Sequence, residues 1–359
     1  MTLDAGGTNL VFTAIRGGEL VTDEITLPSH SDDLDKCLSA VVEGFNTVKS
    51  KLKESPVAIS FAFPGPADYP NGIIGDLPNL PAFRGGVALG PMLHDRFNVP
   101  VFINNDGDLY AYGEAIAGFL PHINGLLEKE GSPKRYKNLL GLTLGTGFGG
   151  GIVHDGSLFD GDNSIAGEIW LSRDKLSPLT NIEEHASIHG LKKAYAREAG
   201  IEINDSPEPK EIYEICIGKR GGNKSAAMNA FAQMAEAVGE AIATAVTLID
   251  GLVVIGGGLS GASSVFLQRV VDEMNGSFVK PDGTRFRRLV ANVYNLEDEK
   301  ALKKFLKGST KEIPVYGSGR RVVYDPEARL GVGISKIGTS RAISLGAYAF
   351  ALMSLDKIS

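Results

Sequence analysis

The sequence contains few of the features that mark a secreted or membrane protein. It has only two cysteines, Cys37 and Cys216, far apart and without a Cys-x-x-Cys spacing. This argues against a disulfide framework and for a reducing compartment. No run of about 18 uninterrupted apolar residues occurs, so we expect no membrane span. Because the chain opens on an apparent strand, we expect no signal peptide and a cytoplasmic protein.

Excess positive charge is also lacking. The chain has 36 lysines and arginines against 43 acidic residues, a net charge of −7. It therefore lacks the broad cationic field that would attract duplex DNA or an anionic membrane. We expect neither nucleic acid nor a membrane as a partner.

The length and composition are those of a globular protein with more than one domain. At 359 residues, with 43% hydrophobic and 22% charged residues, the chain can bury a sizeable core. Because a typical domain has about 150 residues, we expect two domains. Only three residues precede Asp4, so the first strand should be short, and an authentic start upstream of Met1 is left open.

Two short glycine turns are the most informative stretches. In each, an apolar run stops at a Gly/Thr turn and then resumes, as in two antiparallel strands joined by a hairpin. Glycine lets backbone N–H groups point at an anion, although a single such turn could equally be an ordinary hairpin. Two copies suggest a duplicated core that closes on one polyphosphate. The stretches are Leu3-Asp4-Ala5-Gly6-Gly7-Thr8-Asn9-Leu10 and Leu144-Gly145-Thr146-Gly147-Phe148.

The second turn formally matches the Gly-x-Gly-x-x-Gly pattern of dinucleotide-binding proteins. That pattern requires a helix directly afterwards, whereas residues 151–154 indicate a strand. We therefore discount a Rossmann fold.

Apolar spacing predicts alternating strands and helices along the rest of the chain. Residues 119–137 look like a polar surface insertion, and residues 275–336 give the weakest signals. The expected strands are 10–15, 20–27, 57–63, 99–103 and 252–255, and the expected helices are 34–52, 92–97, 111–117, 183–199, 209–218, 225–249, 265–274, 297–307 and 340–355.

Seven motifs in sequence order resemble those of the ROK family (repressors, open reading frames, kinases). The resemblance covers nearly the whole chain and implies an α/β fold: a two-lobed actin-like ATPase, ribonuclease H-like, with duplicated domains of mixed sheets and crossover helices around a central cleft. The motifs are Leu3-Asp4-Ala5-Gly6-Gly7-Thr8-Asn9, Phe63-Pro64-Gly65-Pro66, Pro78-Asn79-Leu80-Pro81, Ile103-Asn104-Asn105-Asp106, Leu144-Gly145-Thr146-Gly147, Ala166-Gly167-Glu168 and Ile255-Gly256-Gly257-Gly258.

The resemblance also implies a domain division. Residues 1–107 would form a smaller N-terminal domain with the first phosphate turn, sugar loops and the catalytic acid. Residues 108–336 would form a larger domain with the second turn, and the helix in 337–359 would pack back on the first domain. A homodimer is expected.

By the same resemblance, Asp106 is the general base that takes the proton of the attacking sugar hydroxyl. A carboxylate at a strand end that opens a helix is fixed by backbone on both sides, which suits this role. The alternative is a helix N-cap, a position that aspartate also favours.

The nucleotide and sugar residues follow in the same way. The first turn and the Gly145 turn resemble phosphate-binding turns. The resemblance implies that Asp4 lies near Mg²⁺ and binds it through water, and that a third glycine turn lies on the adenosine side of ATP. The implied ATP-side residues are Asp4, Gly6, Gly7, Thr8, Asn9, Gly145, Thr146, Gly147, Gly256, Gly257 and Gly258, and the implied sugar contacts are Gly65, Asn79, Asn105, Asp106, Glu168 and Glu183.

One motif departs from the family. Members usually follow the glutamate that matches Glu168 with a glycine, a histidine and a cysteine-rich zinc loop, whereas this chain has Trp170 and no cysteine nearby. A thiolate zinc site cannot form, and His185 with His189 offers too few ligands. We therefore expect no structural zinc and an altered sugar choice, with Trp170 either in the core or stacked on a pyranose.

The leading hypothesis is an ATP- and Mg²⁺-dependent hexose kinase acting on a glucose-like sugar. One alternative is a kinase of an N-acetylhexosamine. The other is a non-catalytic sugar-sensing regulator, which is disfavoured because no helix-turn-helix or basic stripe precedes Asp4.

Overall fold

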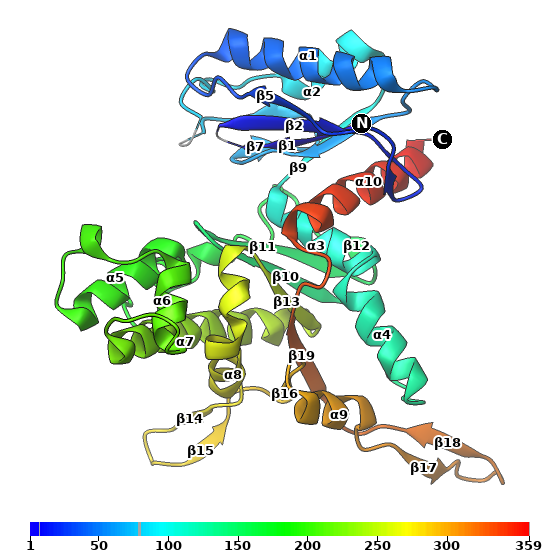
Figure 1. Ribbon diagram of the computed structural model, residues 1–359. Coiled ribbons are helices and arrows are strands. Elements are labelled where there is room, and N and C mark those ends of the chain that lie inside the picture. Colours follow the sequence, from blue (N-terminus) through cyan, green and yellow to red (C-terminus); the bar gives the residue numbers. More distant parts are fainter. Residues whose placement is uncertain (7, 78–79, 359) are drawn as a thin grey trace.

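The chain folds into two lobes, each built on one main sheet with helices on both faces (Figure 1). The computed structural model describes residues 1–6, 8–77 and 80–358. The sheet of the first lobe has the strand order β5-β2-β1-β6-β9, and the sheet of the second has β12-β11-β10-β13-β19-β16.

The two sheets repeat one plan. In the first, β1 pairs antiparallel with β2, which pairs antiparallel with β5, while β1, β6 and β9 run parallel. In the second, β10, β11 and β12 form the antiparallel part, while β10, β13, β19 and β16 run parallel. The strands are β1 Thr2–Ala5, β2 Asn9–Thr13, β5 Ile25–Pro28, β6 Ile59–Ala62, β9 Val101–Asn104, β10 Leu139–Leu144, β11 Phe148–His154, β12 Ser157–Leu158, β13 Leu252–Gly256, β16 Asn292–Asn295 and β19 Arg329–Ile334.

Helices α1 (Leu34–Lys51) and α2 (Leu89–Phe97) cover one face of the first sheet (Figure 1). The Asp33 side chain caps α1 by accepting a hydrogen bond of 3.1 Å from the Lys36 N–H. Buried positions such as Val41, Phe45 and Val48 recur at the spacing of one helix face, so α1 packs on the sheet as its sequence predicts.

Successive residues of the second sheet face different helices. Leu140 and Leu142 of β10 pack in one core, whereas Leu139 packs in another on the opposite face of the sheet. The helices of the first core are α5 Ile188–Ala199, α6 Pro209–Cys216, α7 Lys224–Ile249 and α8 Ser263–Met274, and those of the second are α3 Asp106–Ile116, α4 Phe119–Lys129 and α9 Glu299–Lys307.

Helix α7 is long and apolar enough to cross a membrane by length and composition alone, but half of its most apolar window is buried inside the protein. Among its fully buried residues are Ala227, Ala235 and Val238. That burial is typical of the core helix of a globular protein.

Helix α10 (Thr339–Ile358) lies against α3 and against β6 of the first sheet (Figure 1). The Ser60 hydroxyl donates a hydrogen bond of 2.7 Å to the Ala347 carbonyl, which ties α10 to that sheet. The two helices cross at Gly113 and Gly346, where either residue could carry a Cβ only by overlapping a backbone carbonyl of the other helix. Helices α3 and α10 therefore connect the lobes through close backbone contact.

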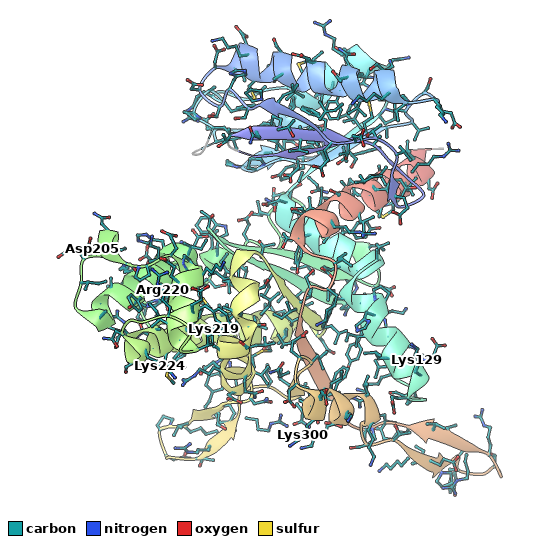
Figure 2. The ribbon with its side chains drawn as sticks, in the orientation of Figure 1. Lys129, Asp205, Lys219, Arg220, Lys224 and Lys300 are labelled. Carbon is teal, nitrogen blue, oxygen red and sulfur yellow. The ribbon has the colours of Figure 1, made fainter. Side chains whose placement is uncertain are left out.

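Several short elements lie at the periphery. Two hairpins of the second lobe extend away from its core (Figure 1). Figure 2 shows charged side chains such as Lys219 and Lys300 pointing outward from this lobe. The remaining short elements are β3 Ile15–Arg16, β4 Glu19–Leu20, β7 Ala67–Asp68, β8 Ile73–Ile74, η1 Ile169–Leu171, η2 Ile182–Glu184, η3 Ile203–Asp205, η4 Gly258–Ala262, β14 Ser277–Val279, β15 Arg285–Arg287, β17 Lys311–Pro314 and β18 Arg321–Tyr324.

The structure corrects several expectations. The helix expected over 183–199 begins only at Ile188, after the 3-10 turn Ile182–Glu184, and the helix expected over 111–117 already begins at Asp106. Residues 119–137 are not a polar insertion, because α4 occupies 119–129 and buries Phe119, Leu120, Ile123 and Leu127. The expected strand 20–27 is in fact split between β4 and β5. The residues of this segment are mostly exposed, so β5 forms through its pairing with β2 rather than through burial of one face.

Candidate active site

The candidate site lies where the parallel strands of the first sheet end. Asp4 of β1 pairs with Ala62 of β6, and Ala62 pairs with Asn104 of β9. Since these three strands run in the same direction, their carboxyl ends meet at one edge of the sheet. Asp4 and Asp106, predicted as separate motifs, are thereby brought to the same edge.

Asp106 is the first residue of α3, and its carboxyl is held by the turn that starts the helix. The Gly107 N–H donates to Asp106 Oδ1 at 2.9 Å and to the side-chain oxygen of Asn105 at 2.7 Å. Asn105 is thus the N-cap, while Asp106 keeps its side chain accessible from the cleft. Crowding by the surrounding protein raises the pKa of the Asp106 carboxyl, and the Gly107 hydrogen bond opposes that rise.

The carboxyls of Asp4 and Asp106 act on each other. Burial is the main cause that raises the pKa of Asp4, and the negative charges of Asp106 and Glu24 raise it further. Two carboxyls that face one space and repel each other suit a divalent cation, whose oxygen ligands are typically carboxylates and water.

The first glycine turn leads from β1 to β2. The Gly6 N–H donates to the Asn9 carbonyl at 2.9 Å, and the exposed residues Thr8 and Asn9 follow it. Gly7, predicted at the centre of this turn, lies outside the described residues, as does the predicted sugar contact Asn79.

The second glycine turn joins β10 to β11, and no helix follows it, as expected. The Gly145 N–H donates to the Gly147 carbonyl at 3.0 Å, and Thr146 is exposed at the tip. Glu183 accepts a hydrogen bond of 2.9 Å from the Phe148 N–H, and a Cβ on Gly147 would lie 2.6 Å from its carboxylate. Glu183, predicted as a sugar contact, is therefore positioned by the second glycine turn.

The third glycine turn follows β13 and lies beside the second. The position of a Cβ on Gly145 is 3.7 Å from the Gly258 nitrogen. Gly257 has a φ of +83°, and a Cβ there would overlap the backbone of Leu144, so this position requires glycine. Gly256 lies against Tyr110, since a Cβ there would be 2.6 Å from the Tyr110 hydroxyl.

Two residues that sequence reasoning missed hold these loops. The Thr339 hydroxyl accepts a hydrogen bond of 2.8 Å from the Gly257 N–H. Tyr69 donates to the Phe63 carbonyl at 2.9 Å, and its hydroxyl lies 3.5 Å from the Asn105 amide and 3.0 Å from a Cβ on Gly65. Tyr69 thus joins two predicted sugar contacts, although neither residue belongs to a recognisable motif.

Close packing of three glycines places the loop of Glu168 in the same region. Gly150 of β11 lies between Gly107 of α3 and Gly167, since a Cβ on either would be within 3.0 Å of the Gly150 carbonyl. The loop that ends at Glu168 is therefore fixed against the helix that begins at Asp106. The Trp170 indole N–H donates to the Glu168 carboxylate, and the Trp170 ring is half-buried against the core.

The family of this chain follows from a comparison with family models. The model described as the ROK family matches residues 1–295. The chain belongs to the ROK family.

Individual relatives agree with this assignment. A glucokinase from Parabacteroides distasonis, known from its crystal structure, is 54% identical, covers 98% of this chain and 96% of its own, and superposes with a TM-score of 0.91. An N-acetyl-D-glucosamine kinase from Photobacterium profundum is 29% identical over 72% of this chain and 83% of its own length. A glucokinase from Thermotoga maritima is 27% identical over 63% of this chain and 73% of its own length. The two-lobed fold of this ROK protein is thus the fold expected from its motifs.

Where ROK members usually carry the zinc loop, this ROK protein has a loop closed by hydrogen bonds. The Asp174 N–H donates to the Thr180 carbonyl at 3.1 Å, and the Ile182 N–H donates to the Ser172 carbonyl at 2.8 Å. Asp174 is completely buried and its carboxylate pairs with His185 Nδ1. His185 therefore belongs to a buried pair rather than to one helix face with His189.

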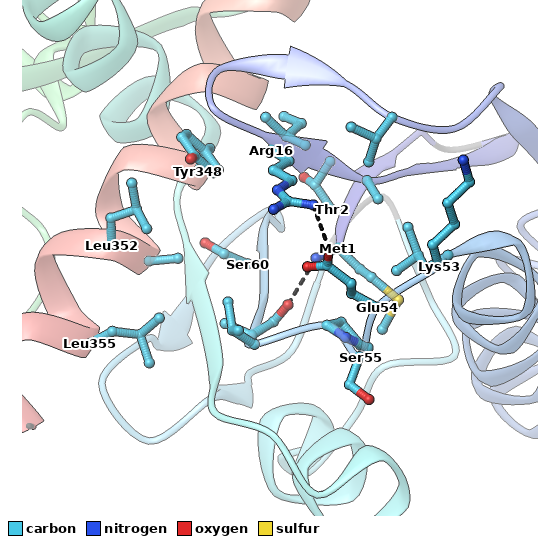
Figure 3. A pocket seen from close by; sticks show the side chains of 18 of the residues that line it. Met1, Thr2, Arg16, Lys53, Glu54, Ser55, Ser60, Tyr348, Leu352 and Leu355 are labelled. Atoms are coloured by element: carbon cyan, nitrogen blue, oxygen red, sulfur yellow. Dashed lines mark hydrogen bonds and ion pairs between the residues drawn. The ribbon is translucent and has the colours of Figure 1, made fainter.

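A cavity of about 570 Å³ lies apart from this site (Figure 3). It is found where β1 and β6 begin, at the edge of the sheet opposite Asp106, and none of the predicted site residues lines it. Arg16 and Glu54 pair across its wall at 2.9 Å, and Leu352 of α10 closes the other side. The parallel strands of the sheet end at the Asp106 edge and not at this cavity, and ligands of such sheets typically bind where parallel strands end.

Proposed function

We propose that this ROK-family sugar kinase transfers the γ-phosphoryl group of ATP to a hydroxyl of a glucose-like hexose. The observation that carries the proposal is the placement of Asp106 at the end of β9, beside Asp4 and linked through the Gly107–Gly150–Gly167 stack to Glu168. Asp106 would remove the proton of the attacking hydroxyl. Its raised pKa makes it a stronger base than an ordinary aspartate.

The glycine turns would hold the nucleotide. Gly6, Gly7, Thr8 and Asn9 of the first lobe and Gly145, Thr146 and Gly147 of the second would bind the phosphates through backbone N–H groups and hydroxyls. Gly257 and Gly258, next to the Gly145 turn, would border the adenosine. Phosphoryl transfer depends mainly on positioning and charge stabilisation, which such turns supply.

Asp4 would bind Mg²⁺ through water. The ion would neutralise charge that develops on the transferred phosphoryl group. The facing carboxyls of Asp4 and Asp106 fit such a cation by their chemistry and mutual repulsion.

The sugar would be bound between Gly65, Asn79 and Asn105 of the first lobe and Glu168 and Glu183 of the second. Amide and carboxylate groups together can donate to and accept from vicinal hydroxyls. We propose that this pairing selects a hexose, with N-acetylhexosamine as the second candidate because a relative of that activity matches over most of its length.

A sugar-dependent ADP-release assay over glucose, fructose, mannose, allose, N-acetylglucosamine and N-acetylmannosamine tests this function. We expect turnover with ATP and Mg²⁺ on a glucose-like hexose, and faster turnover on an N-acetylated sugar would select the second candidate. Absence of ADP release with every sugar would contradict both.

The Asp106→Asn variant should lose about 10²–10⁴-fold in kcat, because a neutral amide cannot accept the proton, while the sugar affinity changes little.

The exposed Asp95 of α2, remote from the cleft, offers the matched control. Asp95→Asn should retain wild-type kcat. Near-normal turnover by Asp106→Asn would refute its role as base while leaving the kinase activity itself in place.

A further inference from the structure

Thr339, the first residue of α10, holds the third glycine turn in place. The Gly257 N–H donates a hydrogen bond of 2.8 Å to the Thr339 hydroxyl, across 82 positions of the chain. Gly257 is half-buried, and its φ of +83° turns the chain between β13 and η4. The turn that would border the adenosine is therefore tied to the start of the helix that reaches the other lobe.

The segment between β19 and α10 is itself fixed on two sides. The Ser335 N–H donates to the Ile255 carbonyl of β13 at 3.1 Å, and the Gly338 N–H donates to the Ser335 hydroxyl at 3.0 Å. The Ser335 hydroxyl in turn donates to the carboxylate of Glu114, a completely buried residue of α3. The start of α10 is thus held between the end of β13 and the helix that begins at Asp106.

The later turns of α10 contact the first lobe. The Tyr348 hydroxyl accepts a hydrogen bond of 3.0 Å from the Gly17 N–H, and the Phe350 ring lies 6.2 Å from the Phe102 ring of β9. Ala347 is buried in a small core with Ala62 of β6. Helix α10 therefore touches the third glycine turn at its first residue and the sheet of the first lobe further along.

We propose that Thr339 is a positioning residue of the nucleotide site, whose hydroxyl fixes the Gly257 turn against the adenosine of ATP and couples that turn, through α10, to the sugar-binding first lobe. The proposal rests on the proposed function. It makes nucleotide and sugar bind cooperatively, and by linkage each ligand then raises the affinity for the other by the same factor.

A role limited to starting the helix fits Thr339 less well. A capping hydroxyl accepts an N–H of its own helix, whereas the N–H that Thr339 binds belongs to a turn in another segment. Thr339 acts on the position of the turn through Gly257 and touches no reacting atom, so we assign it to positioning and not to catalysis.

Steady-state kinetics of Thr339→Val and Thr339→Ser test the positioning role. Valine keeps the shape of the side chain but leaves the Gly257 N–H without its acceptor. The KM for ATP should therefore rise on the order of tenfold, with kcat changed far less. Serine restores the hydroxyl, so Thr339→Ser should return the KM for ATP close to the wild-type value.

Ser340, the exposed next residue of α10, offers the control. Ser340→Ala removes a hydroxyl from the same turn and should keep the wild-type KM for ATP. A wild-type KM in Thr339→Val would overturn the proposal. A lowered Tm in that variant would not rescue it, because a residue that only starts the helix would give the same loss of stability.

The coupling is measured by fluorescence of Trp170, the single tryptophan, whose indole donates to the proposed sugar contact Glu168. Glucose is titrated with and without the magnesium complex of the ATP analogue AMPPNP. In the wild type the analogue should lower the Kd for glucose, and in Thr339→Val this ratio of Kd values should fall toward one. Equal ratios in the two proteins, or a ratio of one in the wild type, would refute the coupling through α10.

Hydrogen exchange of the free protein separates this proposal from the proposed function. Amides in residues 255–262 should exchange on the order of tenfold faster in Thr339→Val than in the wild type, and as in the wild type in Thr339→Ser. Unchanged exchange in Thr339→Val would overturn the positioning role even in an active kinase. Faster exchange in a protein that binds no nucleotide would support the positioning of the turn and contradict the proposed function alone.

Discussion

At the scale of single residues, Asp174 is the clearest case of a side chain that stabilises a functional loop. Its Oδ1 accepts a hydrogen bond of 2.8 Å from the Leu176 N–H, and its Oδ2 pairs with His185. Asp174→Ala should lower the free energy of unfolding by about 1–3 kcal/mol, because it leaves the partly buried Leu176 N–H and the His185 ring without their acceptor. Urea unfolding measures this change.

Asp205, labelled in Figure 2, is an exposed acid on the same lobe and supplies the control. Asp205→Ala should stay within about 0.5 kcal/mol of wild type, as surface substitutions usually do. If the two variants unfolded at the same urea concentration, the Asp174–His185 pair would have no stabilising role. A wild-type sugar affinity in Asp174→Ala would further show that Glu183 does not depend on this loop.

Residue patterns predicted the groups at strand ends far better than the groups that support them. Asp106 and the glycine turns could be found because strand, turn and glycine occur together in the sequence. Tyr69 and Thr339 could not, since their roles depend on contacts between segments distant in the chain. The site roles themselves stay predictions until the variants are measured.

At the scale of elements, the crossing of α3 and α10 depends on two glycines. A Cβ on Gly346 would overlap the Leu109 carbonyl, and one on Gly113 would overlap the Ala342 carbonyl. Gly346→Ala should therefore destabilise the protein by about 1–3 kcal/mol, as overpacking of a well-packed contact does. The measurement is again equilibrium unfolding.

Gly125 of α4 is the matched helix glycine, because a Cβ there would meet no atom within 4 Å. Gly125→Ala should be neutral or stabilising by up to about 1 kcal/mol, since alanine loses less backbone entropy in a helix. Stabilisation by Gly346→Ala would show that the α3–α10 crossing can open without cost.

Helices were predicted correctly where apolar residues recur at helical spacing, and one helix was missed where proline and glycine interrupt its sequence. The helices α7, α8 and α9 begin and end within about two residues of the expected positions, because their apolar residues recur at helical spacing. Helix α4 was missed because Pro121 and Gly125 suggested a loop. Packing of Phe119 and Ile123 against the second sheet outweighs that local preference.

At the scale of the whole molecule, the repeated order of the two sheets gives the duplication that the two glycine turns suggested. The antiparallel part and the parallel part recur in both lobes, and each glycine turn joins the first two strands of its sheet. The motifs could indicate this plan, whereas the exact domain boundaries at residues 107 and 336 stay predictions. The two extended hairpins had no signal in the sequence, since their residues are exposed and lack periodicity.

The division of the site between the lobes predicts that ligands draw the lobes together. Asp4 lies in β1 and Thr8 in the turn between β1 and β2, whereas the Gly145 turn and Glu183 belong to the second lobe. An ATP and a sugar that contact all of them would hold the two lobes together, so we expect the lobes to close on binding. Small-angle scattering of Asp106→Asn with sugar and MgATP should show the radius of gyration falling by on the order of 1 Å relative to the free protein. This variant binds both ligands without consuming them. Sugar alone should give part of the change, and an unchanged radius with both ligands bound would mean that the site is already closed or that the ligands contact one lobe only.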